Sequence, residues 1–338
     1  MAAFLIIAAL SGAAFLSVGL AFPVSGIDGG EGLRMRDAVT LSIDDARARG
    51  QSVEAVAATG AIAVQNPHQD EGSDNDADVG AAPGEIRSLA ARGVHVVVGP
   101  LRANVARAEN AALLQARSVV ITGSARGPSD RGTRVFKLSP SDRQLAATAY
   151  AWMRGHWGNR VCVLDDGTAR ARYRAAAFLA IDPRARQASL GHGDVERCMQ
   201  GVDAVYATAL EADPVFCSAV TARRSPAIAL VRAMALRSFD PTTFARAGKL
   251  WRAEPAPITR TAAIEAVDAR YHKRAFLGAT DAALRFYAAT QIAVTAARGG
   301  GDPRVLLRNR RFGTILGTVR FNNRGELEAP AIVVRPAN

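Results

Sequence analysis

The feature that most constrains the fold is a repeated alternation of short apolar runs with stretches of helical periodicity. The first unit has an apolar run at residues 16–22, a glycine-rich loop at 23–32, and apolar residues at helical spacing over 33–49. A strand, a loop and a helix in this order form the opening unit of a parallel α/β sheet. Because the apolar runs are continuous, we expect strands that are covered by helices on both faces.

The alternation falls into two groups of elements, and its rhythm breaks between them at residues 136–142. Before the break, strands are predicted at 62–64, 94–98 and 118–122, and helices at 83–92 and 104–115. After it, strands are predicted at 160–164, 203–208 and 228–231, helices at 145–157, 173–181, 214–223 and 281–298, and paired strands at 317–334 around a turn at 323–325. A chain of 338 residues is too long for one ordinary core. We therefore predict an α/β protein with two doubly wound parallel-sheet lobes.

The net charge of +11 raises the question of nucleic-acid binding, but the distribution of charge argues against it. Lys137, Lys249 and Lys273 are the only lysines among 42 basic residues, so 39 are arginines, and these are scattered along the whole chain. A nucleic-acid site concentrates basic residues on one element, commonly with aromatic residues between them. Aromatic residues make up only 6% of this chain, so we expect no nucleic-acid partner.

Residues 1–14 are apolar and end in small residues, which is typical of a secretory signal, although a basic segment before them is missing. The small pair before the cleavage point is Ser11 with Ala13 or Gly12 with Ala14. No later run approaches the roughly 20 apolar residues that a membrane-spanning helix needs. We expect residues 1–14 to be a signal peptide and the mature chain to be periplasmic.

The three cysteines, Cys162, Cys198 and Cys217, have neither a CxxC spacing nor the spacing of a metal site. Cys162 lies in an apolar run, as an inert core cysteine does. Cys198 and Cys217 are candidates for a disulfide in an oxidising compartment, but spacing alone does not show that their Cβ atoms meet. The pairing stays open at this point.

One acidic segment resembles part of a calcium-binding loop. Asp74, Asp76 and Asp78, with Glu85 further on, follow much of the EF-hand spacing. Val79 stands where that loop requires glycine, so the segment is predicted to be an acidic solvated loop without a metal.

Motifs for catalysis and for cofactor binding are missing. No GxGxxG follows the first strand, no phosphate-binding GxxxxGK[ST] occurs, and residues 123–127 lack the Gly-x-Ser-x-Gly order of a nucleophile elbow. We expect no cofactor and no enzymatic activity. A cytosolic α/β enzyme with a misinterpreted amino terminus is kept as the less favoured alternative.

Four segments carry a resemblance, each weak alone but consistent in order and spacing. They are 20–48, with a Pro-x-Ser-Gly turn; 85–116, with RGVHVVVGPLRANVARA; 131–167, with RVFKLSPSDRQLAATAY and RVCVLDDG; and 280–334, with RGELEAPAIVV. Together they resemble the leucine/isoleucine/valine-binding family, the substrate-binding proteins of branched-chain amino acid ABC transporters, which have the type I periplasmic binding protein fold.

The resemblance implies two lobes that are joined by three crossovers and that close around a ligand by hinge motion. It implies a first lobe at 15–138 and 258–315 and a second lobe at 139–257 and 316–338, with crossovers near 139–140, 252–257 and 313–317. The implied function is capture of a small polar solute, an amino acid or an organic or aromatic carboxylate, by a monomer that delivers it to an inner-membrane ABC permease. A ligand-sensing regulatory protein of the same fold is the alternative.

In the family, the loops after the fourth and fifth strands offer hydroxyl and backbone N–H groups to a ligand carboxylate. The corresponding candidates here are Arg102, Ala103, Asn104, Ser124, Ala125 and Arg126. Ala103 stands where the family has serine, and Arg126 stands near a usual threonine. N–H groups at a helix start favour an anion, and both arginines offer bidentate contacts to a carboxylate. The alternative that both arginines are solvated rim residues stays open.

The second-lobe candidates depart further from the family. Thr208 follows a strand, Leu210 stands where the family has a ligand-covering tyrosine, and Glu211 is the nearest carboxylate for an α-ammonium group. Ser25, in the first glycine-rich loop, completes the candidates. A buried unpaired ammonium is costly, and the segment after Val231 lacks the acid that the family places there. The sequence therefore favours a carboxylate without an amine at least as strongly as an amino acid, and a cleft that has lost ligand binding stays open.

Overall fold

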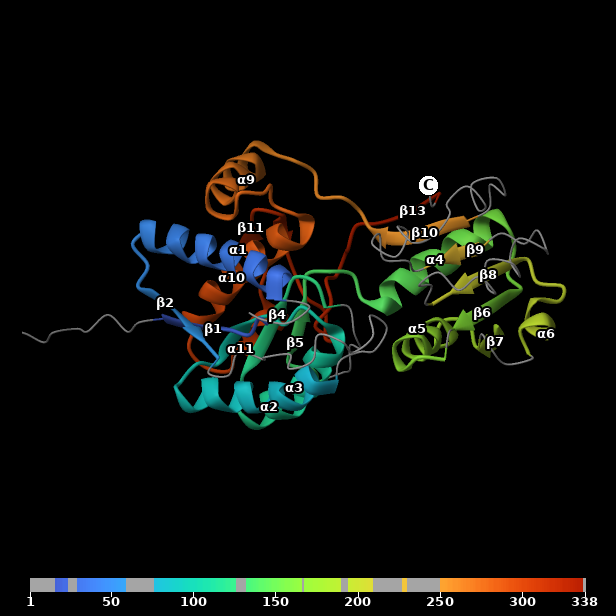
Figure 1. Ribbon diagram of the computed structural model, residues 1–338, viewed down its shortest axis with the longest axis horizontal. Helices are drawn as coiled ribbons and strands as arrows, with labels where there is room; N and C mark the ends of the chain where they lie inside the picture. Colours follow the sequence, from blue (N-terminus) through green and yellow to red (C-terminus); the bar gives the residue numbers. More distant parts are fainter. Residues whose placement is uncertain are drawn as a thin grey trace, which may run out of the picture.

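The computed structural model describes residues 16–23, 29–58, 76–125, 132–165, 167–189, 194–208, 227–229 and 250–336, and they form two α/β lobes (Figure 1). The predicted α/β class with one parallel sheet per lobe is confirmed. The predicted signal peptide, the strand expected at 62–64 and the helix expected at 214–223 lie outside the described residues. Within the described residues, no helix is both long and apolar enough to span a bilayer.

The first lobe is built on five parallel strands in the order β2-β1-β3-β4-β5. Valine, isoleucine and leucine dominate the three central strands, which lie in the core. The strands are β1 (Leu16–Leu20), β2 (Val53–Ala57), β3 (Val96–Val98), β4 (Val119–Thr122) and β5 (Val135–Lys137). One face packs on α1 (Gly29–Ala48), α9 (Ala262–Ala275) and α10 (Asp281–Ala297), and the other on α2 (Asp76–Ala91) and α3 (Ala103–Gln115).

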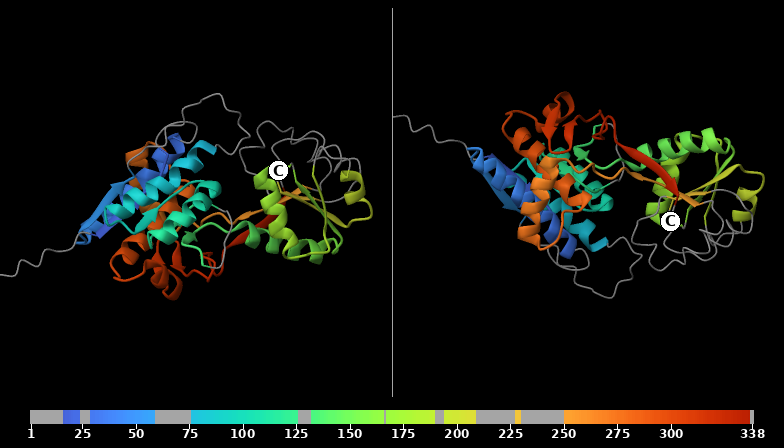
Figure 2. Two further views of the ribbon diagram at one scale, coloured as in Figure 1. Left: turned by 90° about the horizontal axis from the view of Figure 1, so that it is seen from below. Right: turned by 90° about the horizontal axis from the view of Figure 1, so that it is seen from above.

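The second lobe is built on six strands in the order β13-β10-β9-β8-β6-β7, parallel except for the last strand of the chain. The strands are β6 (Val161–Asp165), β7 (Arg186–Ser189), β8 (Ala204–Ala207), β9 (Ala227–Ala229), β10 (Leu250–Pro255) and β13 (Ile332–Pro336). Helices α4 (Asp142–His156) and α5 (Ala169–Leu179) cover one face, and the short α6 (Val195–Met199) lies against β6 and β7. Figure 2 shows the two lobes side by side from two further directions.

Three connections join the lobes. The first leads from β5 to α4 and includes residues 139–140, where a crossover is expected. The second leads from β10 to α9 and begins after Pro255, so residues 252–255 of the crossover expected at 252–257 are instead part of β10. After α11 (Pro303–Asn309), the hairpin of β11 (Phe312–Thr314) and β12 (Gly317–Val319) stays with the first lobe. Phe321 then packs edge-on against Phe136, with ring centroids 5.3 Å apart. This packing favours a third crossover later than residues 313–317, and the lobe boundaries remain a proposal.

Two sequence predictions about local structure are wrong. Residues 76–85 belong to α2, so that part of the acidic segment is helical and is not a loop. The strands expected to pair with each other within 317–334 pair elsewhere: β12 pairs with β11, and β13 pairs with β10. Only an isolated bridge between Phe321 and Leu327 encloses the predicted turn at 323–325.

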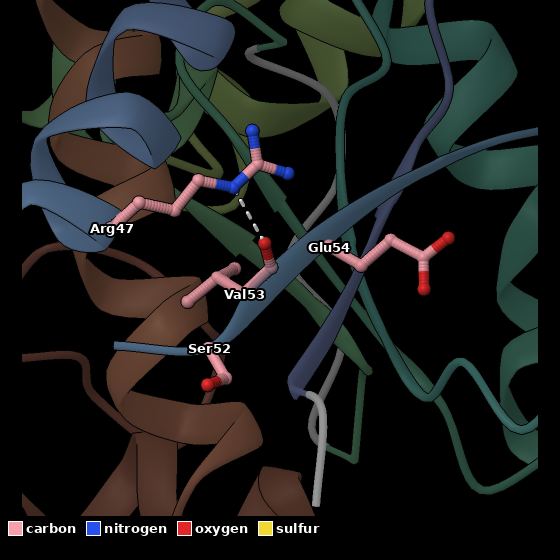
Figure 3. Close-up of a pocket in the computed structure, with 4 residues that line it drawn as sticks. All are labelled: Arg47, Ser52, Val53 and Glu54. Atoms are coloured by element: carbon pink, nitrogen blue, oxygen red, sulfur yellow. Dashed lines mark hydrogen bonds between the residues drawn. The ribbon is translucent and has the colours of Figure 1, made fainter. Parts of the chain in front are cut away.

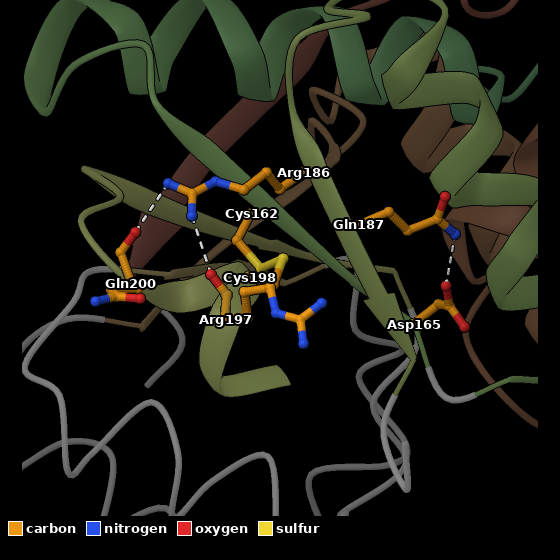
Figure 4. The surroundings of a disulfide bond; sticks show 7 residues. All are labelled: Cys162, Asp165, Arg186, Gln187, Arg197, Cys198 and Gln200. Atoms are coloured by element: carbon orange, nitrogen blue, oxygen red, sulfur yellow. Dashed lines mark hydrogen bonds between the residues drawn. A yellow bond between two sulfur atoms is a disulfide. The ribbon is translucent and has the colours of Figure 1, made fainter. Parts of the chain in front are cut away.

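A disulfide bond joins Cys162 on β6 to Cys198 on α6, with the two Cα atoms 5.5 Å apart (Figure 4). Cys162 is fully buried, as predicted, but it is bonded and therefore not inert, and the candidate pairing of Cys198 with Cys217 is wrong. Arg186 on β7 adds hydrogen bonds to the same region, donating to the carbonyl oxygens of Arg197 at 2.9 Å and Gln200 at 2.8 Å. The bond and these contacts together fasten α6 to this edge of the second sheet.

Glu109, on the face of α3 that packs against α2, is fully buried, and neither carboxyl oxygen has a hydrogen-bond partner in the described part of the chain. Burial, and then the nearby Glu85 carboxylate, raises the pKa of Glu109 well above its ordinary value. Folding therefore favours the protonated, neutral form of the Glu109 carboxyl.

A pH-dependent cost in stability follows from Glu109. Because the pKa of Glu109 is higher in the folded than in the unfolded protein, protonation of this carboxyl stabilises the folded state. That stabilisation is fully present below the unfolded pKa and is lost as the pH rises through the folded pKa. We expect Glu109→Gln to raise the free energy of unfolding at pH 8 by about 1–3 kcal/mol, because glutamine removes the cost of keeping a proton on the buried carboxyl, and the gain should shrink toward pH 5. Urea denaturation at several pH values measures this, and Glu54→Gln, at an exposed position on β2, is the control. An equal gain in the free energy of unfolding at all pH values would contradict the raised pKa of Glu109.

Candidate ligand-binding site

The parallel strands of both sheets direct their carboxyl ends toward the opposite lobe (Figure 1). In sheets of this kind the loops that follow the strands carry the ligand site. Most of the sequence candidates lie in the loops after β3 and β4 in the first lobe and after β8 in the second, and the loop after β6 ends at the same edge of the second sheet as the loop after β8. Helices α3 and α5 begin at two of these loops.

The loops after β3 and β4 are tied together by the hydroxyl of Thr122. Its Oγ1 donates to the carbonyl oxygen of Pro100 at 2.8 Å and accepts the backbone N–H groups of Ser124 at 3.3 Å and Ala125 at 3.1 Å. The hydroxyl of Ser124 donates in turn to the carbonyl oxygen of Leu101 at 2.8 Å. The Ser124 hydroxyl and the N–H groups of Ser124 and Ala125, which the family resemblance implies as donors to a ligand, are engaged within the loops in this structure.

Two glycines allow the backbone to pass close to its neighbours here. Gly99 has a φ of +131°, and a Cβ atom on it would lie 2.2 Å from the carbonyl oxygen of Ala21. A Cβ atom on Gly123 would lie 2.9 Å from the ring of Phe286. Phe286 also meets the half-buried Phe22 edge-on at 5.1 Å, immediately after β1. Phe22 is therefore an apolar candidate for the wall of the site, and it is not among the residues predicted from the sequence.

The start of α3 has the features of an anion site. Arg102 is the N-cap residue, and no described side chain caps the first turn, which begins at Ala103. Asn104 is half-buried, and its Nδ2 atom is buried with no hydrogen-bond partner in the part of the chain that is described. Uncapped N–H groups at a helix start, beside an unpaired amide donor, favour a bound carboxylate.

In the second lobe, Thr208 follows β8 and is fully buried. Its hydroxyl donates to the carbonyl oxygen of Leu164 at 3.2 Å, and its own carbonyl oxygen accepts a hydrogen bond from Arg174 Nη1 at 3.1 Å. The hydroxyl and the carbonyl group of Thr208 therefore both hold the end of β8 in place.

Beneath that strand end lies a buried charged cluster. The Nε atom of Arg174 on α5 is 3.5 Å from Oδ1 of Asp142 on α4, and both side chains are buried. The Tyr206 hydroxyl is buried without a hydrogen-bond partner among the described residues. Burial, followed by the Asp142 carboxylate, raises the pKa of Tyr206 well above its ordinary value, so the phenol is neutral.

Asp165, at the carboxyl end of β6, is also buried, and the described groups that donate to it are neutral. It accepts hydrogen bonds from the hydroxyl of Ser189 at 2.7 Å, the side-chain amide of Gln187 at 2.8 Å and the backbone N–H of Gly167 at 2.8 Å. Its role is to order the loop before α5. The described residues contain no group of three or more His, Cys, Asp or Glu side chains that could hold a metal ion.

The remaining candidates, Ser25, Arg126, Leu210 and Glu211, lie outside the described residues. A surface hollow does occur elsewhere, lined by Arg47, Ser52, Val53 and Glu54 (Figure 3). It lies at the amino end of β2, the end of the sheet opposite the loops described above, and Arg47 Nε donates there to the Val53 carbonyl oxygen at 2.8 Å. The hollow is therefore not part of the candidate site.

Two α/β lobes with parallel sheets and three connections define the type I periplasmic binding protein fold, and comparison with solved structures bears this out. A substrate-binding protein of an ABC transporter from Desulfitobacterium hafniense matches with a TM-score of 0.68 and 17% identity over 96% of this chain and 97% of that one. The branched-chain amino acid substrate-binding protein LivJ from Streptococcus pneumoniae, in complex with isoleucine, matches with a TM-score of 0.58 and 16% identity over 95% and 99%.

A solute-binding protein of an ABC transporter from Rhodopseudomonas palustris, in complex with p-hydroxybenzoic acid, matches with a TM-score of 0.62 and 14% identity over 96% and 93%. No protein-family model and no curated protein matches the chain. At these identities the matches show a shared fold. The predicted fold of the leucine/isoleucine/valine-binding proteins is thus confirmed.

Proposed function

We propose that this protein is an extracytoplasmic solute-binding component of an ABC transporter that captures a small carboxylate between its lobes. The observation that carries the proposal is the match of both lobes, over nearly the whole chain, to solved substrate-binding proteins of such transporters. Those proteins are substrate-binding proteins and not enzymes, which supports a binding function without catalysis. Capture then works by lobe closure, driven by the ligand's higher affinity for the closed state.

The ligand is proposed to be a carboxylate because of the chemistry at the start of α3. The solved relatives hold leucine, isoleucine or hydroxybenzoic acids, all of which carry that group. The uncapped helix start and the unpaired Nδ2 atom of Asn104 offer donors to it. The proposed ligand-contacting residues are Ser25, Arg102, Ala103, Asn104, Ser124, Ala125, Arg126, Thr208, Leu210 and Glu211.

The proposed compartment is the periplasm, reached by a signal peptide at residues 1–14. The disulfide between Cys162 and Cys198 supports this proposal, because disulfides persist in oxidising compartments and are rare in the cytosol. The proposed partner for delivery is an inner-membrane ABC permease, and the proposed state in solution is a monomer.

A thermal-shift and calorimetry screen of the protein tests the binding function. Its panel is leucine, isoleucine, 4-hydroxybenzoate, 3,4-dihydroxybenzoate and short dicarboxylates. A ligand at ~100 times its dissociation constant adds roughly 2.7 kcal/mol to the free energy of unfolding. A response to hydroxybenzoates alone would support an anion site without an ammonium partner. A response to leucine would assign that partner to an acid such as Glu211. No response from any carboxylate would contradict the proposal.

The role of Asn104 is tested by Asn104→Ala. A hydrogen bond to a charged group contributes roughly 1.5–3 kcal/mol, so the variant is expected to bind the responding carboxylate about 10- to 100-fold more weakly. The matched control is Gln115→Ala, at an exposed position on the last turn of the same helix. Unchanged affinity in Asn104→Ala would remove this residue from the site.

A further inference from the structure

One contact between the lobes lies outside the candidate ligand site. The guanidinium carbon of Arg107 on α3 lies 4.8 Å from the centre of the Tyr173 ring on α5. A cation within about 6 Å of a ring centre is attracted by the negative face of the aromatic system. Because α3 packs on the first sheet and α5 on the second, this attraction acts between lobes.

The two residues occupy equivalent positions on the helices of their two lobes. Arg107 is the fifth residue of α3, and Tyr173 is the fifth residue of α5. Each helix starts at a strand end that faces the opposite lobe, so the pair lies one helical turn away from the loops that form the candidate site. Arg107 is exposed and Tyr173 half-buried, which places the contact at the rim. In Figure 1, α3 and α5 lie on the lower side of the molecule, away from the three connections.

We propose that Arg107 and Tyr173 form a latch that favours the closed arrangement of the lobes before any ligand binds. The contact needs both lobes close together, so it exists only in the closed arrangement and is lost when the lobes open. An exposed cation–π pair is expected to change the ratio of open to closed molecules by about two- to fivefold. The inference rests on the proposed function in one respect, namely that the lobes open and close.

The chemistry of the pair predicts how the latch behaves. An arginine guanidinium stays charged throughout the physiological range, and the ring face attracts it without the tyrosine hydroxyl. The open-to-closed ratio set by this pair is therefore independent of pH between 5 and 8. Tyr173→Phe is expected to preserve the latch, whereas Tyr173→Leu and Arg107→Gln remove it.

The test measures the distance between the lobes in the full chain without ligand. A keto amino acid in place of Arg87 on α2 and of Ala176 on α5, both exposed, carries labels for single-molecule energy transfer and avoids the cysteines. Arg107→Gln and Tyr173→Leu are each expected to raise the open-to-closed ratio two- to fivefold. The double variant should go no further than either single one. Arg172→Gln, exposed on α5, is the matched control and should leave the ratio unchanged.

Two results would overturn the latch: an unchanged ratio in both single variants, or effects that simply multiply in the double variant. The same labelled proteins are then titrated with leucine and with 4-hydroxybenzoate. Closure by either ligand, together with an unchanged ligand-free ratio in the variants, rejects the latch and keeps the solute-binding function. Opening in Arg107→Gln, without a response to any carboxylate of the panel, keeps the latch and rejects that function.

Discussion

Replacing Arg174 with methionine is expected to lower the free energy of unfolding by about 3–5 kcal/mol, the range for removing one partner of a buried ion pair. Arg174 and Asp142 are each only 6% exposed, so Arg174→Met leaves a carboxylate in the interior without its cation. The variant also removes the donor to the carbonyl oxygen of Thr208, and thus loosens the end of β8. Unfolding in urea measures the change.

The three tryptophans of the chain provide a local signal for that measurement. Trp152, Trp157 and Trp251 pack against one another in the second lobe, the lobe that contains Arg174, so their fluorescence reports unfolding of that lobe. Arg172→Met, at an exposed position on the same helix, controls for the change of residue type.

A second variant separates the lost ion pair from lost packing. If the cost comes from an uncompensated charge, Asp142→Asn combined with Arg174→Met should recover a large part of the lost stability, because the isolated carboxylate is gone. A double variant that is as unstable as Arg174→Met alone would show that packing around α5 is responsible instead. Tyr206→Phe, which removes a buried hydroxyl that has no described hydrogen-bond partner, is expected to be neutral or slightly stabilising.

Three inner strands could be predicted from the sequence because each is a continuous apolar run, whereas β10, which lies between β13 and β9 and contains Arg252 and Glu254, was not predicted as a strand. The predictions at 94–98, 118–122 and 160–164 correspond to β3, β4 and β6, and all three strands are buried throughout. A strand with helices on both faces has no polar side to mask its pattern. The long helix α10 could also be predicted, because apolar residues recur at helical spacing along 281–298.

The edge strands could not be predicted in the same way. Residues 53–57 form β2 with a mixed pattern of buried and exposed side chains, and 186–189 form β7 with exposed arginine and glutamine. An edge strand has one neighbouring strand and is solvated on its other side, so polar residues are tolerated and the apolar signal is lost. Their positions follow from pairing with β1 and β6, which is tertiary information.

The candidate site likewise has features that the sequence predicts and features that depend on tertiary structure. The loops at 101–104 and 122–125 follow from where the strands end, and the structure places them together through Thr122 and Ser124. In the structure, the N–H groups of Ser124 and Ala125 donate to the Thr122 hydroxyl and are therefore used inside the loop. The sequence did not predict this use. Hydrogen bonding between loops depends on side-chain positions that residue spacing does not specify.

The disulfide of the second lobe leads to the other large effect. Cys162 and Cys198 are 36 residues apart, and a bond that closes a loop of this length lowers the entropy of the unfolded chain by the equivalent of about 4 kcal/mol. We therefore expect Cys162→Ala combined with Cys198→Ala to lower the free energy of unfolding by about 3–4 kcal/mol. Non-reducing peptide mapping checks the pairing first, and a peptide joined through Cys198 and Cys217 would contradict it.

The reductant itself provides the control for this prediction. Dithiothreitol should lower the melting temperature of the native protein toward that of the double variant and should leave the double variant unchanged, since its bond is already absent. Hydrogen exchange is expected to speed up first in α6 and β7, because the covalent link between α6 and β6 is then gone and α6 keeps only non-covalent contacts to this sheet edge, among them the two hydrogen bonds from Arg186. Faster exchange spread evenly over both lobes would show instead that the bond stabilises the whole chain and not this edge of the second sheet.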